Sequence, residues 1–291
     1  MDLDIISMSP GAQRWLHGHG QARLLHVFDA VCNLVNEDGE VLSLVAQGVA
    51  NGPLSAVVER GGFTDWLTIQ SSVLLAPPVL LVGDGIFKFG RATIWEPRPD
   101  WAALRGSGHA LQAASARILD LLSKHAEAES FAWLVIRDVE APGGDARVIA
   151  KAAAAIQELL PAFAAEDVER MRASARALAG LGSGLTPAGD DFLLGVMHAL
   201  WATRPEPQAL ALSLVLAEEA APRTNSLSAA WLRAAAQGEA GEPWHELFAA
   251  IVAGDTEVEA RAVLRILPTG HSSGADALGG FAGFILTEAG Q

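Results

Sequence analysis

The sequence contains one cysteine and few basic residues, and both shortages exclude whole classes of protein. Cys32 has no second cysteine with which to form an internal disulfide, and there is no Cys/His framework for a metal ion. Only 20 Lys and Arg stand against 34 Asp and Glu, so the formal net charge is −14. Nucleic-acid binders and proteins held electrostatically on a membrane surface need basic residues to neutralise phosphates. The composition therefore argues against both classes.

Long hydrophobic runs are also absent. The longest, Val73–Val82, is interrupted by Pro77-Pro78 and is too short to span a bilayer. The first residues lack the basic start and apolar stretch of a secretory signal. Because 51% of the residues are hydrophobic and only 19% are charged, the chain is typical of a globular protein rather than a disordered one. We expect a cytoplasmic protein.

Residues 1–100 are predicted to form a β-rich domain. Short apolar segments alternate with turn sequences, among them Asp38-Gly39 and Gly83-Asp84-Gly85, as in hairpins. Several short strands at this spacing are typical of a small β-barrel or a sandwich. The expected strands are Leu24–Val35, Val41–Val45, Leu54–Val58, Val79–Val82 and Ile86–Trp95.

Residues 101–291 are predicted to form a larger α-helical bundle, which gives an α+β protein with a boundary near Pro97-Arg98-Pro99. Apolar residues recur there at steps of three and four from about Ser107 onward. The segment Phe131–Val139 fits either a strand or a helix. The other expected helices are Ala150–Leu160, Asp167–Ala179, Phe192–Trp201, Gln208–Ala220, Ser226–Ala236, Trp244–Val252, Val258–Leu267 and Ala275–Thr287.

A first glycine-rich motif, Gly180–Gly195, leads into one of these helices with the sequence GLGSGLTPAGDDFLLG. Thr186 is suited to cap the helix through its hydroxyl, and Pro187 to occupy the first helical position, where no N–H is needed. Gly182 and Gly184 permit a positive φ and a close approach of the backbone to a ligand. Successive N–H groups in such a loop can bind an anion. The alternative is a well-capped, tightly packed helix without a ligand.

A second glycine-rich motif, Gly270–Gly280, precedes another apolar helix, with Ser273 and Asp276 at capping-box spacing. Its likeness to the first motif predicts that the two helices begin close together and direct their N-termini at one site. A third polar cap lies at Arg223–Ser228. The identities in the ungapped alignment are Gly189 with Gly274, Asp191 with Asp276, Leu193 with Leu278, and Gly195 with Gly280.

These motifs resemble those of the AllH-type family, which is associated with oxamate carbamoyltransferase. The Thr-Pro-x-Gly-Asp-Asp segment at 186–191 carries the most specific match. Thr224–Ser228 fits a Thr-Thr-x-x-Ser pattern of the family, with Asn225 at the second Thr. The resemblance covers the helical half and touches the strand half only around Gly52-Pro53. It implies phosphorolysis of oxalurate to oxamate and carbamoyl phosphate, or the reverse, in purine (allantoin) breakdown, beside FdrA-like and AllG-type subunits.

The residue types themselves suit carbamoyl transfer, which needs donors for a phosphate and polarisation of a carbonyl rather than a side-chain nucleophile. Asp190, Asp191 and His271 are the candidate catalytic residues. We expect Asp191 to organise the loop, Asp190 to face the substrate or Mg²⁺, and His271 to act in acid–base chemistry. The candidate substrate- or phosphate-binding residues are Gly182, Ser183, Gly184, Thr186, Arg223, Thr224, Ser272, Ser273, Gly274 and Asp276.

Other interpretations stay open at this point. Arg223 could clamp a carboxylate or phosphate, or be a solvated surface arginine. The chain could be a non-catalytic assembly subunit, or a metal-dependent hydrolase that uses Asp190, Asp191 and His198, although a structural histidine is the simpler interpretation of His198. We expect no metal site and no cofactor, Mg²⁺ being the one exception considered. The expected partners are a small anionic substrate and the protein subunits, with no nucleic acid and no membrane.

Overall fold

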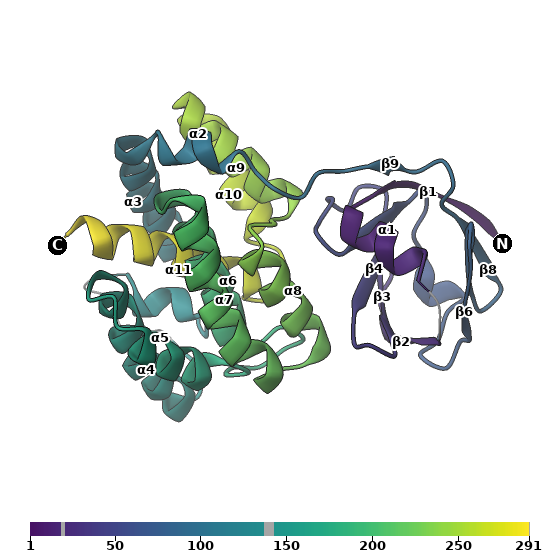
Figure 1. The fold of residues 1–291 in the computed structure, drawn as a ribbon, viewed down its shortest axis with the longest axis horizontal. Coiled ribbons are helices and arrows are strands. Elements are labelled where there is room, and N and C mark those ends of the chain that lie inside the picture. The colour runs from purple at the N-terminus through teal and green to yellow at the C-terminus, as the bar shows by residue number, and fades with distance from the viewer. Residues whose placement is uncertain (19–20, 137–142, 291) are drawn as a thin grey trace. The chain divides into compact units, whose positions relative to one another are not determined.

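The computed structural model describes residues 1–18, 21–136 and 143–290, and it divides the chain into two compact units (Figure 1). The first comprises residues 1–97 with 240–242, and the second residues 98–239 with 243–291. A unit of strands is followed by a unit of helices, so the predicted α+β class is confirmed. Within the described residues, no helix is long and apolar enough to cross a membrane.

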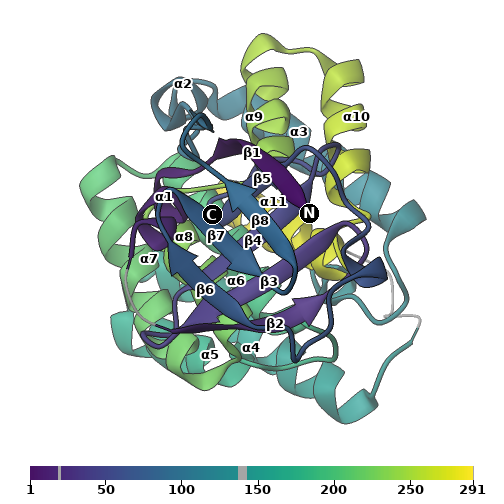
Figure 2. The same cartoon turned by 90° about the vertical axis from the view of Figure 1, so that its right-hand side faces the viewer.

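The first unit is a nearly closed β-barrel (Figure 2). Its strand order is β2-β3-β4-β5-β1-β8-β7-β6, with β9 beside β1, and a bridge from Gln21 to Leu74 brings the two ends of this series together. Buried side chains such as Leu16, Phe63 and Phe87 fill the interior. The strands are β1 (Asp2–Met8), β2 (Ala22–Val27), β3 (Val31–Asn36), β4 (Val41–Ala46), β5 (Ser55–Val58), β6 (Val73–Ala76), β7 (Val79–Val82), β8 (Gly85–Lys88) and β9 (Thr93–Ile94).

Both predicted hairpins are confirmed. Strands β3 and β4 pair in antiparallel register around Asp38-Gly39, where Gly39 has a φ of 78°. Strands β7 and β8 pair around Gly83-Asp84, with Val82 opposite Gly85. The turn residues thus establish the register of these strands, as expected from their sequence.

Two of the predicted strands are wrong in extent. Leu24–Val35 is two strands, because the chain reverses after Val27 and the N–H of Phe28 donates to the carbonyl of Val31 at 2.8 Å. Ile86–Trp95 leaves the ladder after Lys88 and pairs again only at β9. Apolar residues continue through both breaks, so composition alone did not reveal them.

Strands β1 and β6 and the helix α1 (Pro10–Leu16) were not predicted. Strand β1 buries Leu3 and Ile5 alternately, as in a half-buried strand, and then Met8, after a register shift between Ile5 and Ser7. Helix α1 begins at Pro10 after Ser9, whose hydroxyl accepts the N–H of Ala12 at 3.0 Å. This Ser-Pro pair is a recognisable start signal for a helix.

The second unit confirms the predicted helices to within a few residues at most ends. Of Phe131–Val139, the part from 131 to 134 is a 3₁₀ helix, η2 (Phe131–Leu134), and residues 137–139 lie outside the described residues. The helices are α2 (Trp101–Arg105), α3 (Gly108–His125), α4 (Ala146–Ala164), α5 (Val168–Leu178), α6 (Ala188–Thr203), α7 (Glu206–Ala220), η3 (Ala221–Arg223), α8 (Ser226–Ala236), α9 (Glu242–Ala253), α10 (Thr256–Ile266) and α11 (Ser273–Ala289).

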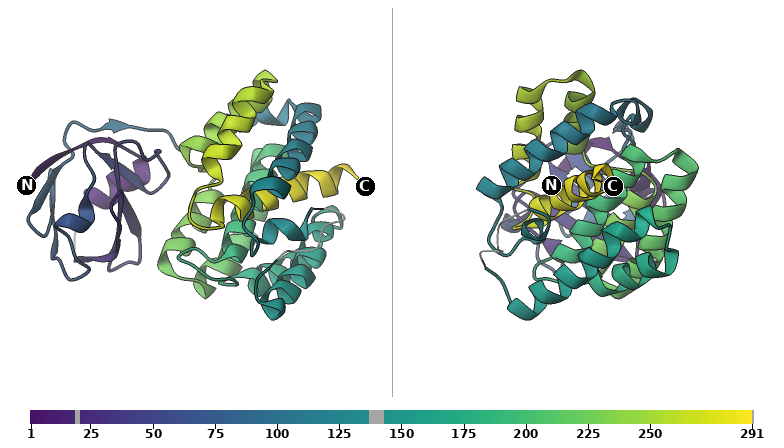
Figure 3. Two further views of the ribbon diagram at one scale, coloured as in Figure 1. Left: turned by 180° about the vertical axis from the view of Figure 1, so that it is seen from behind. Right: turned by 90° about the vertical axis from the view of Figure 1, so that its left-hand side faces the viewer.

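Helices α6 and α11, which follow the two glycine-rich motifs, form the centre of this unit (Figure 3). They are buried along most of their length and touch where each carries a glycine. A Cβ on Gly195 would lie 1.9 Å from the carbonyl oxygen of Ala277, and a Cβ on Gly280 would lie 2.1 Å from that of Phe192. Positions 192 and 277 are equivalent in the alignment of the motifs, so the crossing is approximately symmetric.

The other aligned glycines repeat this symmetry at the start of each helix. A Cβ on Gly189 would lie 2.1 Å from the carbonyl oxygen of Leu178 at the end of α5. A Cβ on Gly274 would lie 2.0 Å from that of Ile266 at the end of α10. The sequence repeat is therefore a structural repeat in which each helix starts against the end of the helix before it.

Replacing Gly195 by alanine should destabilise the protein by about 2 kcal/mol or more, because the methyl group must displace backbone atoms. Gly108, exposed at the start of α3 with open space around its Cα, is the matched control. Gly108→Ala should leave stability unchanged or raise it by up to about 1 kcal/mol. Urea unfolding followed by circular dichroism measures both, and equal stabilities for the two variants would contradict the close crossing.

Candidate functional site

The two glycine-rich motifs meet through their hydroxyl groups. Thr186 Oγ1 lies 2.7 Å from Ser273 Oγ, although the two residues are 87 positions apart. The prediction that helices α6 and α11 begin close together is confirmed. The loops before the two helices therefore lie side by side, although they are far apart in the sequence, and both can contact the same ligand.

The capping predictions are wrong for both motifs. Pro187, rather than Thr186, is the N-cap of α6, and it has no side-chain cap hydrogen bond. Ser272, rather than Ser273, is the N-cap of α11. The physical reason is that the hydroxyls of Thr186 and Ser273 contact each other and the carboxyl group of Asp191 rather than the backbone N–H groups of the first helical turns.

A cavity of about 300 Å³ lies between the motifs. The first motif contributes Gly182, Ser183 and Ala188 to its lining, and the second contributes Ser272. Two further segments complete it, one just before and into η2 and the other at the start of α4. The residues from these segments are Glu129, Phe131, Gly144, Asp145, Val148 and Ile149.

The loop before α6 offers backbone donors beside this cavity. Gly180, Gly182 and Gly184 have φ values of 67°, 114° and 102°, so the positive φ predicted at Gly182 and Gly184 is confirmed. Among the described residues, no backbone carbonyl accepts an N–H from residues 182–186. By contrast, the N–H of Gly189 donates to the carbonyl of Leu181 at 2.8 Å. The donors available to an anion are therefore those of the loop rather than that of the first helical turn.

Asp190 holds the loop in place with both carboxylate oxygens. Oδ1 accepts the N–H of Gly180 at 2.9 Å, and Oδ2 accepts the hydroxyl of Thr224. Burial raises the pKa of Asp190 above its ordinary value, and these hydrogen bonds act against that rise. Asp190 therefore connects the first motif to the Arg223–Ser228 segment.

Asp191 and Asp276, equivalent positions of the repeat, are both buried, with 8% and 0% of their surface exposed. Burial raises the pKa of Asp191 well above its ordinary value, and the charge of Asp276 adds to the rise. Burial also raises the pKa of Asp276 to about 7, although Ser130 Oγ and the N–H of Phe131 donate to its Oδ1 at 2.7 and 2.6 Å. For both residues Oδ2 is buried without a hydrogen-bond partner in the described chain.

His271 and the serines lie on the open side of the site. The side chain of His271 is 69% exposed, and its Nε2 lies 2.9 Å from Oε1 of Glu129, a residue that lines the cavity. Ser183 is exposed and Ser272 is half-buried. A bound molecule could reach these groups without any rearrangement of the core.

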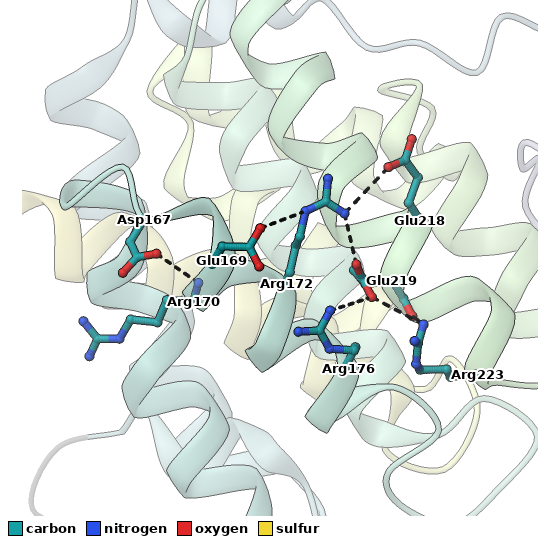
Figure 4. Close-up of polar contacts among 8 residues, drawn as sticks. All are labelled: Asp167, Glu169, Arg170, Arg172, Arg176, Glu218, Glu219 and Arg223. Atoms are coloured by element: carbon teal, nitrogen blue, oxygen red, sulfur yellow. Dashed lines mark hydrogen bonds and ion pairs between the residues drawn. The ribbon is translucent and has the colours of Figure 1, made fainter.

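Arg223 is engaged away from the cavity lining (Figure 4). Its Nη1 donates to the backbone carbonyl of Glu219 at 2.5 Å and lies 3.4 Å from the carboxylate of the same residue. Arg172 and Arg176 approach that carboxylate at 3.0 and 3.1 Å. The hydrogen bond from Arg172 is the main cause that lowers the pKa of Glu219. Glu219 thus gathers three guanidinium groups from α5 and η3.

The third polar cap is confirmed at Asn225, whose Oδ1 accepts the N–H of Ser228 at 3.0 Å. Its Nδ2 donates to the carbonyl of Leu185 at 2.8 Å, so this segment supports the loop of the first motif from a second side. Of the predicted binding residues, Thr224 therefore contacts the loop through Asp190, whereas Arg223 does not reach the cavity wall.

His198 lies in an aromatic cluster rather than in a polar site. Its ring centroid is 4.9 Å from that of Trp244 and 6.0 Å from that of Trp101, and burial lowers its pKa to about 3. His198 is thus a neutral core residue. Within the part of the chain that the structure describes, no three His, Cys, Asp or Glu side chains could hold a metal ion together. Asp190, Asp191 and His198, the residues named for a hydrolase, therefore do not form such a group.

Sequence reasoning missed Glu129, Ser130, Phe131 and Asp145. Asp145 caps α4 by accepting the N–H of Arg147 at 2.8 Å, and an aspartate after two glycines is a recognisable start signal. The other three were not found because tertiary contacts place them: Ser130 and Phe131 contact Asp276, and Glu129 contacts His271.

The raised pKa of Asp276 predicts a specific pH dependence of stability. A carboxyl whose pKa rises on folding stabilises the folded protein below its ordinary pKa, and that contribution disappears as the pH rises toward 7. Relative to Asp276→Asn, the wild-type protein should therefore lose about 1.4 kcal/mol of unfolding free energy per pH unit between about pH 4 and 7.

The comparison with Asp276→Asn is needed because His198, with its lowered pKa, changes stability in the opposite direction over much of the same range. Urea titrations of both proteins at several pH values give the difference directly. A difference that does not vary with pH would show that Asp276 titrates normally.

Comparison with protein families agrees with the two-unit structure. Residues 5–93 match the model of the AllH family N-terminal domain, and residues 178–285 match the model described as oxamate carbamoyltransferase subunit AllH. The second match includes both glycine-rich motifs and the cap at Arg223–Ser228. No solved structure matches the chain. Because the two matches together cover most of its length, the chain belongs to the AllH family of oxamate carbamoyltransferase subunits.

Proposed function

We propose that this chain provides an anion-binding site for carbamoyl transfer between oxalurate and phosphate, at the cavity between the two glycine-rich motifs. The reaction would yield oxamate and carbamoyl phosphate, or run in reverse. Membership of a family of carbamoyltransferase subunits supports the reaction class. The position of the site is supported by the glycine-rich loop.

The observation that carries the proposal is the set of free backbone donors at residues 182–186. Positive φ at Gly180, Gly182 and Gly184 alternates with ordinary φ at the residues between them, which is the geometry that turns successive N–H groups toward one side. Ser183 and Ser272 add hydroxyl donors from both motifs to the cavity. A phosphate or a carboxylate can be bound by such groups without an arginine.

Carbamoyl transfer matches what these groups can do. An oxygen of phosphate attacks the carbamoyl carbon of oxalurate, the bond from that carbon to the oxamate nitrogen breaks, and the nitrogen takes up a proton. N–H and hydroxyl donors would hold the phosphate and stabilise the charge that develops on the carbamoyl oxygen. His271, exposed beside Glu129, is the candidate to supply the proton to the leaving nitrogen.

The remaining candidates act behind this surface. Asp190 and Thr224 hold the loop, and Thr186, Ser273 and Gly274 keep the two motifs together. Arg223 binds Glu219, so it could meet a substrate carboxylate only after leaving that partner. Binding of Mg²⁺ by Asp190 stays a prediction, since both of its oxygens accept hydrogen bonds from the protein.

The family name describes a subunit, so we propose that activity requires protein partners, with FdrA-like and AllG-type subunits as the candidates. The alternative is that this chain has only an assembly role, in which the glycines merely allow helices to pack. The close crossing of α6 and α11 supports the packing role for Gly195 and Gly280, but it leaves the exposed loop at residues 183–185 unexplained.

Substitution of Gly184 by alanine tests the loop. Gly184 and Gly254 both have positive φ, 102° and 70°, and a Cβ on either would meet no close atom. Both alanine variants should therefore lose similar stability, about 1 kcal/mol, through backbone strain alone. Only Gly184→Ala should weaken the binding of phosphate and oxamate, at least tenfold, because it alters the donor geometry.

Isothermal titration calorimetry of the two variants measures the anion binding, and assays of carbamoyl transfer with the partner subunits measure turnover. Unchanged binding and turnover in Gly184→Ala would refute the site. Loss of turnover with intact co-purification of partners would exclude the assembly role. Product release from oxalurate without added phosphate would favour a hydrolase.

A further inference from the structure

Two buried carboxylate oxygens lie behind the cavity without hydrogen-bond partners among the described residues, Oδ2 of Asp191 and Oδ2 of Asp276. The two residues occupy equivalent positions of the repeat, in the first turns of α6 and α11. The charge of Asp276 acts on Asp191 and, after burial, is the main cause that raises its pKa. Two ionised carboxylates buried in this way are unfavourable unless a proton or a cation neutralises them.

Burial favours the proton over the cation. Neither Oδ2 has appreciable surface accessible to water. A magnesium ion usually keeps several water ligands and would have to displace protein atoms, whereas a proton needs no additional space. The hydroxyls of Thr186 and Ser273 interact with Asp191 as well as with each other, and Oδ2 of Asp191 still has no hydrogen-bond partner in the described chain.

The pair is directly connected to the cavity wall. Asp276 accepts the N–H of Phe131, a residue of the lining, and its own N–H donates to the carbonyl of Ser272, another lining residue, at 2.9 Å. Asp191 interacts with the hydroxyls of Thr186 and Ser273, which join the two motifs. A charge placed in the cavity therefore acts on both carboxyl groups through a thin layer of protein.

We propose that Asp191 holds a proton in the free protein, and that an anion bound in the cavity brings a second proton to the pair, on Asp276. The pair then adjusts its charge to that of the ligand, because negative charge in the cavity favours the neutral acid. This inference rests on the proposed function in one respect, namely that the cavity binds an anion.

The other titratable groups around the pair do not supply this proton. Asp190, on the same helix, accepts two hydrogen bonds as an anion would. Asp145, at the start of α4, caps its own helix, and Glu129 Oε1 lies 2.9 Å from His271 Nε2 on the exposed side. His198, further along α6, is a neutral core residue. Asp276 has a pKa near 7, so it is the group that anion binding can protonate at neutral pH.

Infrared difference spectroscopy on the free, full-length protein tests the first half of the proposal. At pH 8, where Asp276 is mostly ionised, we expect the carbonyl stretch of a buried protonated carboxylic acid, largely absent from Asp191→Asn and retained in Asp120→Asn, an exposed aspartate on α3. Absence of this band from the wild-type protein would overturn the proposal. So would stoichiometric binding of Mn²⁺ or Mg²⁺ that is lost in both Asp191→Asn and Asp276→Asn, because a cation would then neutralise the pair.

Calorimetric titration with oxamate, whose carboxylate does not titrate between pH 5 and 8, tests the second half. Measured at pH 8 in buffers of different ionisation enthalpy, the wild-type protein should take up close to one proton per anion, and its Kd should rise about tenfold per pH unit above pH 7. Near pH 5 the uptake should vanish, because both carboxyl groups already hold protons.

Asp276→Asn is the decisive variant, because its amide keeps the oxygen that accepts from Ser130 and Phe131 yet is neutral at every pH. It should bind oxamate with an affinity that does not change from pH 6 to 8 and without proton uptake, whereas Asp120→Asn should behave as the wild type. Binding without proton uptake by the wild-type protein would refute this inference alone. Failure of both oxamate and phosphate to bind would instead refute the proposed function, and with it the coupling.

Discussion

The close crossing of α6 and α11 is the contact on which the helical unit depends. Gly195 and Gly280 let the two backbones approach to distances that no side chain would permit, and Gly189 and Gly274 do the same at the helix starts. Because the crossing brings equivalent ends of two similar motifs together, the loops before both helices open onto one cavity. In the interior, the charge of Asp276 also acts on Asp191. A packing requirement thereby creates the candidate site.

Acidic residues near a proposed anion site present an electrostatic difficulty, which the structure reduces in two ways. Asp190 is satisfied by the N–H of Gly180 and the hydroxyl of Thr224, so its charge serves to hold the loop. Asp191 and Asp276 are buried where ionisation is unfavourable, and their raised pKa values favour the neutral acid. The local charge that a ligand would meet is therefore less negative than the formal charge of −14 suggests.

Much of the fold could be predicted because its signals are local. Helical periodicity located the helices of the second unit, and Asp38-Gly39 located a hairpin. Local signals failed where a partner elsewhere in the chain decided the outcome. Thr186 was expected to cap its own helix, but its hydroxyl is hydrogen-bonded to Ser273. The strand expected over Leu24–Val35 is two strands separated by a chain reversal, which the composition does not indicate.

By itself, the sequence determined the α+β class, the repeat of glycines, aspartates and leucines, and the positive φ of the loop glycines, because each depends on residue type and spacing. Only the tertiary structure decided which residues face the cavity. In that structure Phe131 donates its N–H to Asp276, Arg223 pairs with Glu219, and His198 packs among aromatic rings. The contacts of Phe131 and His198 join segments that are distant in sequence, and no local sequence pattern indicates them.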